Sequence, residues 1–494
     1  MSLINPLSLS RSSRTYICRS CRRSTPRGRR RYATATAAPK REDVPDIYDV
    51  VCVGGGPAGL SLLTGLRASK ATSHLRVALV ESQDLDRSRT WTLPSDRYSN
   101  RVSSLTTTSV EYLEAIGAWQ HVQRSRVQPY NEMQVWDGVT GSRISFDRSS
   151  AASPSKTIAS MTENLNLMSA LLARLDDLGG VSIFDKSKVE DIELGSETES
   201  LDLRGWPVVG LSNGRRLAAR LLIGADGANS PVRTFAGIES RGWDYERHAV
   251  VATVKLEGSG WGREENDKIA YQRFLPSGPV ALLPLPNNFS TLVWSTLPSY
   301  ASYLKTLSAF DLAAMINASF RLSPTDLAYM HTPDCNDPAE ELAWREKYTD
   351  FHAELIPQRV TDVQEGSVAS FPLRMRHADT YIGERVALVG DAAHTIHPLA
   401  GQGLNQGQGD VQSLVRTIEY AVLHGQDIGA QLSLSPYLSS RYAANNTLLG
   451  TVDKLHKLYS VDSGPIVGLR SWGLGMVDKM GSVKAALMDR AAGN

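Results

Sequence analysis

The chain has 494 residues, more than one hydrophobic core usually supports, so we expect two domains. Hydrophobic residues make up 41% of it, which excludes an intrinsically disordered protein. The formal net charge is +1, but residues 1–41 hold 11 basic and no acidic residues, which leaves 42 basic against 52 acidic residues in the remainder. A body with this balance is a poor match for sequence-independent nucleic-acid binding, which depends on neutralising phosphates, so we expect no nucleic-acid partner.

The first 41 residues are rich in arginine, serine and threonine and lack the apolar core of a secretory signal. This composition is typical of a mitochondrial transit peptide removed near Arg31 to Ala35, although a disordered basic tail has a similar composition. Cys18 and Cys21 lie in this segment without a second pair of ligands, so we expect no metal site there. No run of about 18 apolar residues exists in the sequence, so it predicts no membrane-spanning helix.

The first glycine motif follows an apolar run, Val50–Val53, that is typical of a strand buried on both faces. The motif reads Gly-Gly-Gly-Pro-Ala-Gly from Gly54 and leads into a predicted helix over residues 61–69. In this context we expect Gly54 to permit the turn, Gly56 to let the backbone approach a pyrophosphate, and Gly59 to let helix and strand pack closely. The helix N-terminus then offers N–H groups and a partial positive charge to phosphates.

A second predicted strand, residues 75–80, ends at Glu81, which lies 22 residues beyond Gly59. A carboxylate at about this spacing accepts hydrogen bonds from the ribose hydroxyls of an adenosine. This half of the site therefore predicts a bound dinucleotide without deciding which one.

A second acidic turn occurs within residues 221–237. This segment combines a predicted buried strand, the turn Gly-Ala-Asp-Gly that contains Asp226, and a helix expected to begin near Asn229 or Ser230. Alone, such a turn has modest specificity, and it gains meaning only beside the other motifs.

A third motif follows a largely apolar predicted strand, residues 385–389. It begins with Gly390 and Asp391, and the carboxylate of Asp391 can accept a hydrogen bond from a flexible sugar-alcohol chain. The turn over residues 398–403 has little side chain to obstruct a flat ring. A helix expected over residues 404–423 points its N-terminus at that ring, where the helix dipole stabilises negative charge on a reduced flavin.

The motifs GGGPAG, GADGANSPVR and GDAAHTIHPLAGQGLN, in this order, resemble those of the FAD-dependent aromatic hydroxylases related to para-hydroxybenzoate hydroxylase. The resemblance implies FAD as the cofactor, held at one end by the first glycine loop and at the other by the third motif. It also implies that Asp226 and Arg233 bind either FAD or NAD(P)H. The implied cofactor-binding residues are Gly54, Gly56, Gly59, Glu81, Arg101, Asp226, Asp391, Gly401 and Gly403.

Further stretches are similar to the mitochondrial branch of this family that acts in ubiquinone biosynthesis, among them NRVSSLTTTSVEYLEAIGAW, MQVWDG and LRSWGLGMVDKMGSVKAALMDRAAG. The similarity runs from about Asp46 to the C-terminus, whereas the acidic stretch His331–Val360 carries no motif of the branch. It implies hydroxylation at C5 of the ring of a 3-polyprenyl-4-hydroxybenzoate-type intermediate, by way of a flavin C4a-hydroperoxide.

The same resemblance implies several partners. These are a prenylated benzoate substrate, molecular oxygen, a ferredoxin and its reductase as electron donors, and a multiprotein ubiquinone-biosynthesis complex. It also implies peripheral membrane contact at the matrix face of the mitochondrial inner membrane. We identify no catalytic base. His394 and His397 lie in the third motif, where we expect them to hold the loop in place instead of transferring protons.

We expect an α/β fold, with a Rossmann-like FAD-binding domain interleaved with a mixed β-sheet substrate domain and followed by C-terminal helices. The expected FAD-binding domain takes residues 46–126, 160–240 and 376–446. The substrate domain takes residues 127–159 and 241–375, where alternating patterns over 249–256 and 290–296 predict strands. Residues 447–494 are predicted to be helical, either as a helix pair packed on the body or as a segment resting on a membrane surface.

Two other functions compete with the monooxygenase interpretation. One is an FAD-dependent dehydrogenase or isoprenoid reductase that inserts no oxygen. The other is a flavin-bound scaffold of a biosynthetic complex without turnover. The complete set of motifs argues against a scaffold, which needs no ring-facing turn over residues 398–403.

Overall fold

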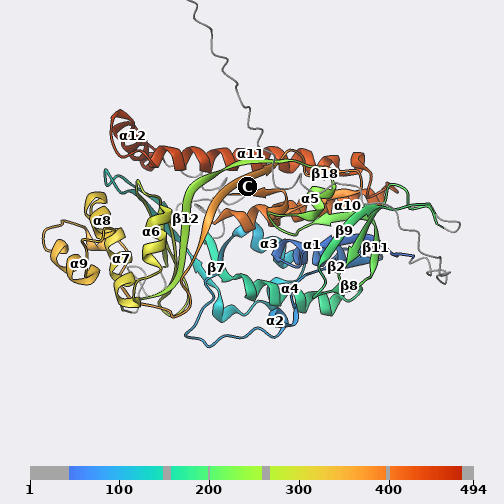
Figure 1. Ribbon diagram of the computed structural model, residues 1–494, viewed down its shortest axis with the longest axis horizontal. Coiled ribbons are helices and arrows are strands. Elements are labelled where there is room, and N and C mark those ends of the chain that lie inside the picture. Colours follow the sequence, from blue (N-terminus) through green and yellow to red (C-terminus); the bar gives the residue numbers. More distant parts are fainter. Residues whose placement is uncertain (1–43, 148–156, 198–200, 259–267, 397–400, 481–494) are drawn as a thin grey trace, which may run out of the picture. The chain divides into compact units, whose positions relative to one another are not determined.

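The computed structural model describes residues 44–147, 157–197, 201–258, 268–396 and 401–480. Contacts divide the chain into Met1–Val44 and Pro45–Asn494, and every element named below belongs to the second unit. The leader predicted for residues 1–41 lies outside the described residues. Figure 1 shows the strands and helices of the second unit, which confirm the predicted α/β class.

An eight-stranded sheet draws all its strands from the segments predicted to bind FAD. Its path is β18-β19-β11-β1-β2-β8, with β10 joining β11 to β9 at the side. The strands are β1 (Asp46–Val53), β2 (Val77–Val80), β8 (Val181–Phe184), β9 (Val189–Leu194), β10 (Pro207–Leu211), β11 (Arg216–Gly224), β18 (Ile382–Gly383) and β19 (Val386–Leu388). The strands predicted over 50–53, 75–80 and 385–389 are thus confirmed, with ends shifted by a few residues.

The parallel register of this sheet aligns four strand ends. Val53 of β1 lies opposite both Val80 of β2 and Gly224 of β11, and Gly224 lies opposite Leu388 of β19. The carboxyl ends of parallel strands meet at one edge of a sheet, where ligands of such folds bind. The loops that follow β1, β2, β11 and β19 therefore begin side by side.

Helices α1 (Pro57–Ala68), α4 (Asn164–Leu178) and α10 (Gln402–Leu423) lie beside this sheet, and α1 packs against both α4 and α10. Helix α1 starts directly after Gly56, because Pro57 presets the first-turn φ and has no N–H to leave unpaired. Its leucines Leu60, Leu63 and Leu66 are fully buried, and each such burial stabilises the fold by about 1.5–3 kcal/mol.

A nine-stranded sheet is built mainly from the segments predicted for the substrate domain. Its path is β20-β17-β12-β15-β14-β13-β5-β6, with β16 beside β12. The strands are β5 (Glu132–Asp137), β6 (Arg143–Asp147), β12 (Ser240–Leu256), β13 (Ile269–Phe274), β14 (Val280–Pro284), β15 (Phe289–Thr296), β16 (Val360–Val363), β17 (Ala369–Ala378) and β20 (His394–Thr395). A third sheet joins β3 (Val102–Thr106), β7 (Ala159–Glu163) and β4 (Gln128–Tyr130). The predicted domain boundaries themselves stay a prediction.

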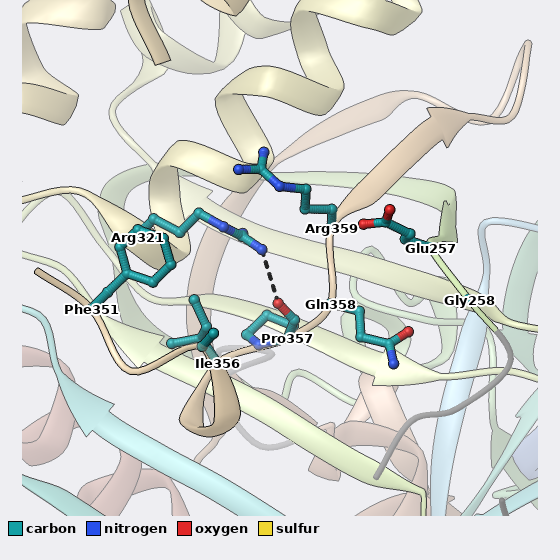
Figure 2. Close-up of a pocket in the computed structure, with 9 residues that line it drawn as sticks. Glu257, Gly258, Arg321, Phe351, Ile356, Pro357, Gln358 and Arg359 are labelled. Atoms are coloured by element: carbon teal, nitrogen blue, oxygen red, sulfur yellow. Dashed lines mark hydrogen bonds between the residues drawn. The ribbon is translucent and has the colours of Figure 1, made fainter. Parts of the chain in front are cut away.

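Four helices gather beside β12, away from α1 and α4 (Figure 1). They are α6 (Pro298–Leu304), α7 (Ala309–Arg321), α8 (Pro324–Met330) and α9 (Pro338–Glu346). The acidic stretch His331–Val360, which carries no family motif, supplies α9 and the segment that follows it. Figure 2 shows how buried Arg321 at the end of α7 holds this segment, donating to the carbonyl oxygen of Pro357 at 3.1 Å.

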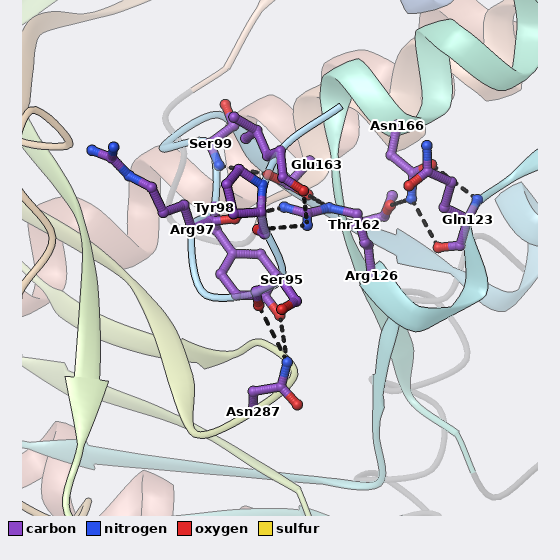
Figure 3. A network of polar contacts seen from close by, with 12 residues as sticks. Ser95, Arg97, Tyr98, Ser99, Gln123, Arg126, Thr162, Glu163, Asn166 and Asn287 are labelled. Atoms are coloured by element: carbon purple, nitrogen blue, oxygen red, sulfur yellow. Dashed lines mark hydrogen bonds and ion pairs between the residues drawn. The ribbon is translucent and has the colours of Figure 1, made fainter. Parts of the chain in front are cut away.

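A buried ion pair fixes the loop that precedes β3 (Figure 3). Arg126 Nε lies 2.6 Å from Glu163 Oε2, and Glu163 is fully buried. The other Glu163 oxygen accepts from the backbone N–H of Ser99 at 2.5 Å, and Arg126 donates to the carbonyl oxygen of Arg97 at 2.8 Å. The guanidinium also lies 4.7 Å from the ring centre of Tyr98. Because a buried charge needs a partner, this pair determines the course of residues 97–99.

The same loop is tied to the nine-stranded sheet. Gln364 exchanges two hydrogen bonds with the backbone of Tyr98, each 2.8 Å long. Asn287 donates to the hydroxyl of Tyr98 at 3.4 Å and to the carbonyl oxygen of Ser95 at 3.3 Å (Figure 3). The loop therefore connects β7 of the three-stranded sheet with the nine-stranded sheet immediately before Arg101.

The C-terminal part is helical as predicted, within the described residues. Helix α11 (Gln431–Tyr459) packs along α10, and α12 (Pro465–Lys479) contacts β6. In the described part of the chain, no helix is long and apolar enough to cross a membrane.

A buried histidine lies in an aromatic cluster beside the nine-stranded sheet. His331 stacks on Tyr300 with ring centres 4.0 Å apart and meets Trp294 edge-on. Its Nδ1 donates to the carbonyl oxygen of Leu327 at 2.8 Å, since a carbonyl can only accept. Burial lowers the pKa of His331 to about 4, because the charged form loses its hydration.

Breaking the Arg126–Glu163 pair should destabilise the protein strongly. We expect Glu163→Gln to lower the free energy of unfolding by about 3–5 kcal/mol, because the buried guanidinium of Arg126 loses its counter-charge. Urea unfolding followed by circular dichroism measures this change. The control Asp176→Asn breaks the exposed pair with Arg89 and should change stability by less than about 1 kcal/mol. Equal small losses in both variants would contradict the assigned role.

Stability should also depend on pH through His331. Its pKa is lowered from 6.5 to about 4 in the folded state, so between these values the unfolded chain binds more protons. Neutral, buried His331 therefore contributes to the free energy of unfolding in full above pH 6.5, and this contribution decreases by about 3 kcal/mol as the pH falls to 4. Urea titrations at several pH values should show a shallower pH dependence for His331→Phe than for the unaltered chain. The same dependence in both proteins would show that His331 does not cause it.

Candidate functional site

The first glycine loop follows the end of β1, and its three expected roles correspond to three different geometries. Gly54 has a φ of +108°, and a Cβ there would lie 2.2 Å from the carbonyl oxygen of Ala225, so only glycine permits this turn. A Cβ on Gly59 would lie 2.0 Å from the carbonyl oxygen of Gly54, so α1 and β1 can approach only without a side chain there. A Cβ on Gly56 would meet no atom within 4 Å, because this residue faces an open cavity.

Glu81 follows β2 and turns its carboxylate back toward the glycine loop. Its Oε2 accepts a hydrogen bond from the backbone N–H of Gly55 at 2.6 Å. Its Oε1 accepts from the backbone N–H of Gln83 at 2.7 Å and from the hydroxyl of Ser82 at 3.1 Å. An ionised carboxylate offers about four lone-pair positions, so Glu81 can hold the loop and still accept from hydroxyl groups of a ligand.

Asp226 lies in the turn after β11 with an incomplete set of hydrogen bonds. Its Oδ2 accepts from the backbone N–H of Val232 at 3.3 Å, whereas its buried Oδ1 has no partner among the described residues. Burial raises the pKa of Asp226, and hydrogen bonds from Ser230 and the backbone only partly oppose this change. A buried acceptor without a partner is costly, so a donor from a bound ligand would satisfy it.

Arg233 joins the second motif to the third. Its guanidinium donates to the carbonyl oxygen of Ala392 at 2.8 Å and to that of Ala228 at 2.7 Å. These contacts give Arg233 a positioning role between segments that are 159 residues apart in the sequence.

Asp391 follows β19 within a single turn of 3-10 helix, Gly390–Ala392. Its side chain is exposed to a cavity, although the surrounding protein still raises the pKa of the carboxyl group by removing bulk solvent. The charge of His394 opposes this increase. Asp391 is thus positioned to accept a hydrogen bond from a group that fills the cavity.

His394 is occupied by a buried ion-pair network instead of facing the cavity as a free base. Its Nε2 lies 2.5 Å from Asp410 Oδ2, and both side chains are almost fully buried. The other oxygen of Asp410 accepts from Arg441 at 3.0 Å and from Asn445 at 2.9 Å. Burial alone would raise the pKa of Asp410, but His394, Arg441 and Asn445 together lower it. This arrangement favours the structural role expected for His394, whereas His397 lies outside the described residues.

The turn before α10 has the left-handed backbone that glycine favours. Gly401 has a φ of +59° and forms the N-cap of α10. Asn405, one turn later, accepts from the backbone N–H of Thr106 at 3.0 Å and donates to the carbonyl oxygen of Ser104 at 2.7 Å. The amide therefore ties the start of α10 to β3. The neighbouring residues 397–400 of the predicted ring-facing turn lie outside the described residues.

These elements surround one cavity of about 1060 Å³. Eight of the nine predicted cofactor-binding residues line it, and Gly59 packs behind the loop. The eight are Gly54, Gly56, Glu81, Arg101, Asp226, Asp391, Gly401 and Gly403. Arg101 is exposed there, and its guanidinium has no hydrogen bond or ion pair with any described residue. The structure thus brings together segments that lie far apart in the sequence.

The part of the cavity wall formed by β17 was not predicted from any motif, and it contributes Phe371, Leu373 and Arg374. Thr395 of β20 and the next residue, Ile396, also line the cavity, and they belong to the third motif. The hydroxyl oxygen of Thr395 is buried and lacks a hydrogen-bond partner among the described residues. The predicted alternation of the substrate domain indicated a sheet near the flavin, but it did not identify which strand would line the cavity.

The residues around the cavity fit FAD by their chemistry. Gly56 leaves open space at the N-terminus of α1, where phosphates bind to free N–H groups. Among the described residues, the guanidinium of Arg101 has no ion-pair partner and Oδ1 of Asp226 is a buried acceptor without a hydrogen-bond partner. Glu81 and Asp391 supply carboxylates at the two ends expected for the ribose and the sugar-alcohol chain.

A smaller cavity of about 340 Å³ lies elsewhere, beneath the segment that follows α9 (Figure 2). It is lined by Arg321, Phe351, Ile356 and Arg359, among others, and contains none of the predicted cofactor-binding residues. Arg321 already donates to protein oxygens there, so this cavity offers no comparable set of free groups.

Comparison with known proteins agrees with the motifs. A family model described as "FAD binding domain" matches residues 47–444. The chain is 40% identical to "Ubiquinone biosynthesis monooxygenase COQ6, mitochondrial" of Schizosaccharomyces pombe, over 90% of this chain and 92% of the relative. It is 39% identical to the protein of the same name in Saccharomyces cerevisiae, over 94% of this chain and 98% of that relative. The human protein of that name is 35% identical, over 90% and 92%.

Solved structures show the same fold at lower sequence identity. The p-nitrophenol 4-monooxygenase PnpA from Pseudomonas putida is 18% identical with a TM-score of 0.64, over 91% of this chain and 99% of that chain. PqsL, described as a probable FAD-dependent monooxygenase from Pseudomonas aeruginosa, is 20% identical with a TM-score of 0.61, over 87% and 99%.

The geometry of Gly59 predicts a specific loss of cofactor. We expect Gly59→Ala to fold without bound FAD, because the added Cβ would meet the carbonyl oxygen of Gly54 at 2.0 Å and displace the loop. Absorbance of the purified protein near the flavin bands measures the bound fraction. The control Gly450→Ala adds a Cβ in open space within α11, so this variant should keep its FAD. Full flavin content in Gly59→Ala would contradict the assigned packing role.

Proposed function

The chain belongs to the FAD-dependent monooxygenases of ubiquinone biosynthesis, and from this premise we propose that it hydroxylates a prenylated phenol ring. The expected substrate is a 3-polyprenyl-4-hydroxybenzoate-type intermediate and the expected position is C5. The observation that supports this function best is the single cavity shared by the three FAD motifs and by β17 of the other sheet. A monooxygenase needs such a cavity, since cofactor and substrate ring must meet in a space that excludes water.

FAD, when bound, supplies the activation of molecular oxygen, and the chain supplies binding and orientation. We assign the pyrophosphate to the N-terminus of α1 and to Arg101, and the adenosine ribose to Glu81. Asp391 is assigned to the sugar-alcohol chain of the cofactor. Gly401 and Gly403 leave room beside the ring system because they carry no side chain.

The substrate ring is assigned to the side of the cavity formed by β17. Phe371 and Leu373 offer apolar surface there, and the hydroxyl of Thr395, which has no partner in the part of the chain that the structure describes, offers a hydrogen-bonding group. Orientation matters because only one ring carbon should meet the reacting oxygen. We assign no catalytic base, because His394 is already paired with Asp410.

The proposal includes the partners expected from the family. These are molecular oxygen, a ferredoxin and its reductase as electron donors, and a ubiquinone-biosynthesis complex. The mitochondrial names of the relatives and the arginine-rich leader support a mitochondrial location. We propose peripheral contact with the matrix face of the inner membrane, where a substrate with a long prenyl chain would reside.

Cells that lack this protein should accumulate a prenylated 4-hydroxybenzoate-derived ring without the C5 oxygen. Lipid extraction and mass spectrometry identify the accumulated precursor. The unaltered gene should restore ubiquinone, whereas Asp391→Ala should not, because it removes a carboxylate from the FAD cavity. The control Asp350→Ala changes an exposed carboxylate outside the cavity and should restore ubiquinone fully. Normal ubiquinone in the deletion strain would exclude the proposed step.

A further inference from the structure

Helix α9 presents two large aromatic side chains on the surface of the protein. The helix lies beyond α7 as seen from β12 (Figure 1), and it packs against α7 and buries Pro338 and Leu342. Trp344 is 54% exposed and Tyr348, just beyond the end of the helix, is 76% exposed, with their ring centres 5.3 Å apart. Tryptophan and tyrosine are enriched at protein–protein interfaces, so an exposed pair of this kind is a candidate contact surface.

The segment around this aromatic pair has more carboxylates than basic groups. Residues 331–360 contain seven acidic and three basic residues. Two of the three basic residues already form ion pairs within the protein, so their charges are neutralised. These pairs join Arg345 to Asp326 and Glu341, and Arg359 to Glu346.

The charges that remain on this surface are mostly negative. Five exposed carboxylates of the segment form no ion pair with any residue that the structure describes, against one exposed lysine in the same condition. The carboxylates belong to Asp334, Asp337, Glu340, Asp350 and Glu354, and the lysine is Lys347. Glu340 lies four residues before Trp344, and this spacing places the two side chains on the same side of α9. The aromatic pair is therefore accompanied by negative charge that contacts within the protein do not neutralise.

Arg345 shows how carboxylates and rings in this region hold a guanidinium group together. Its Nε lies 2.6 Å from Glu341 Oε1, and its Nη1 contacts Asp326. The same guanidinium lies 4.7 Å from the ring centre of Tyr329 and 5.8 Å from that of Trp344. A cation is attracted both by a carboxylate and by the face of an aromatic ring. The exposed surface beside Arg345 offers the same two kinds of group to a cation from outside.

The excess of carboxylates limits which partner can cover the exposed side of α9. A surface of anionic lipid headgroups would be repelled by it. A second copy of this chain would also be repelled, because residues 42–494 contain 42 basic and 52 acidic residues. A protein segment rich in lysine and arginine complements both the carboxylates and the rings.

We propose that the exposed side of α9, defined by Glu340, Trp344 and Tyr348, docks onto a segment of another protein that is rich in lysine and arginine. Cationic side chains of that segment lie against the two rings and pair with the carboxylates around them. The inference deepens the multiprotein complex included in the proposed function and rests on it for the presence of a partner. It assigns one contact of that complex to a stretch of the chain that carries no motif of the family.

The first test introduces the photoreactive amino acid benzoylphenylalanine in place of Tyr348 in the full chain, in cells that lack the unaltered protein. Irradiation followed by mass spectrometry identifies the peptide that is cross-linked to this position. We expect a peptide of another protein in which lysine and arginine outnumber aspartate and glutamate. The control introduces the same amino acid in place of Tyr420 of α10, which is 54% exposed and lies outside the α9 surface, and it should not yield this peptide.

A second test reverses the charge of the surface while position 348 carries the photoreactive group. Asp334→Lys with Glu340→Lys should lower the yield of the cross-link at least about tenfold, because the altered surface repels a basic partner. The matched control Glu111→Lys with Glu114→Lys reverses two exposed carboxylates of α3 (Thr107–Ala115) and should leave the yield unchanged. Flavin absorbance and circular dichroism of the purified variants establish that they are folded. Because no substrate turnover is measured, a failure here does not depend on the outcome of the hydroxylation experiment.

Four outcomes would overturn the proposal. Position 348 could yield no more cross-linked peptide than position 420, or the peptide could carry no excess of lysine and arginine. The cross-link could join position 348 to a lipid or to this same chain, its basic residues 1–41 included, in which case no other protein covers the surface. Both charge-reversed variants could also give the same yield as the chain with unaltered carboxylates.

Discussion

The parallel register of β1, β2, β11 and β19 is the constraint on which the site depends. It aligns Val53, Val80, Gly224 and Leu388, so the four loops that follow begin at one edge of the sheet. Side chains separated by more than 300 residues in sequence can then face one cavity. The same edge carries the N-terminus of α1, where the backbone offers unpaired N–H groups. A shift of this register by one residue would turn every side chain to the opposite face of the sheet and separate these groups.

Buried polar contacts then hold the aligned loops in place. Arg233 joins the second motif to the third through backbone carbonyl oxygens, and Asn405 ties α10 to β3. The His394–Asp410 pair lies directly behind the third motif, where Asp410 also accepts from the backbone N–H of Gly390 at 3.2 Å. Each of these groups is satisfied by specific partners, and a low-dielectric surrounding makes such satisfied networks rigid. The cavity is thus surrounded by loops that contacts within the protein hold in position.

The two large sheets contribute different kinds of groups to the cavity of this monooxygenase. The eight-stranded sheet supplies the groups suited to FAD, whereas β17 of the nine-stranded sheet supplies apolar surface on the other side. The loop at residues 97–99 contacts Arg126, Glu163 of β7 in the three-stranded sheet, and Gln364 next to β16 of the nine-stranded sheet. On the surface of the protein, the ion pair of Arg470 with Asp137 determines which side of α12 faces away from the body.

The amino-acid sequence by itself determined the fold class, the cofactor and many of the residues that line the large cavity. The sequence predicted the first glycine motif and the acidic residue after β2 because strand, turn and helix follow one another locally and the required backbone geometry admits few residue types. These residues are Gly54, Gly56, Gly59 and Glu81. The strand ends and the start of α10 were predicted to within a few residues for the same reason. His394 was expected to be structural, but its partner Asp410 could not be identified.

Only the tertiary structure decided the contacts between distant segments. The Arg126–Glu163 pair, the cavity side formed by β17 and the outward face of α12 each depend on residues that no local pattern connects. Periodicity along α12 shows that it has an apolar side, yet it cannot show which side is buried. That choice follows from the position of Asp137, 333 residues before Arg470, because a buried carboxylate must be paired with a positive charge.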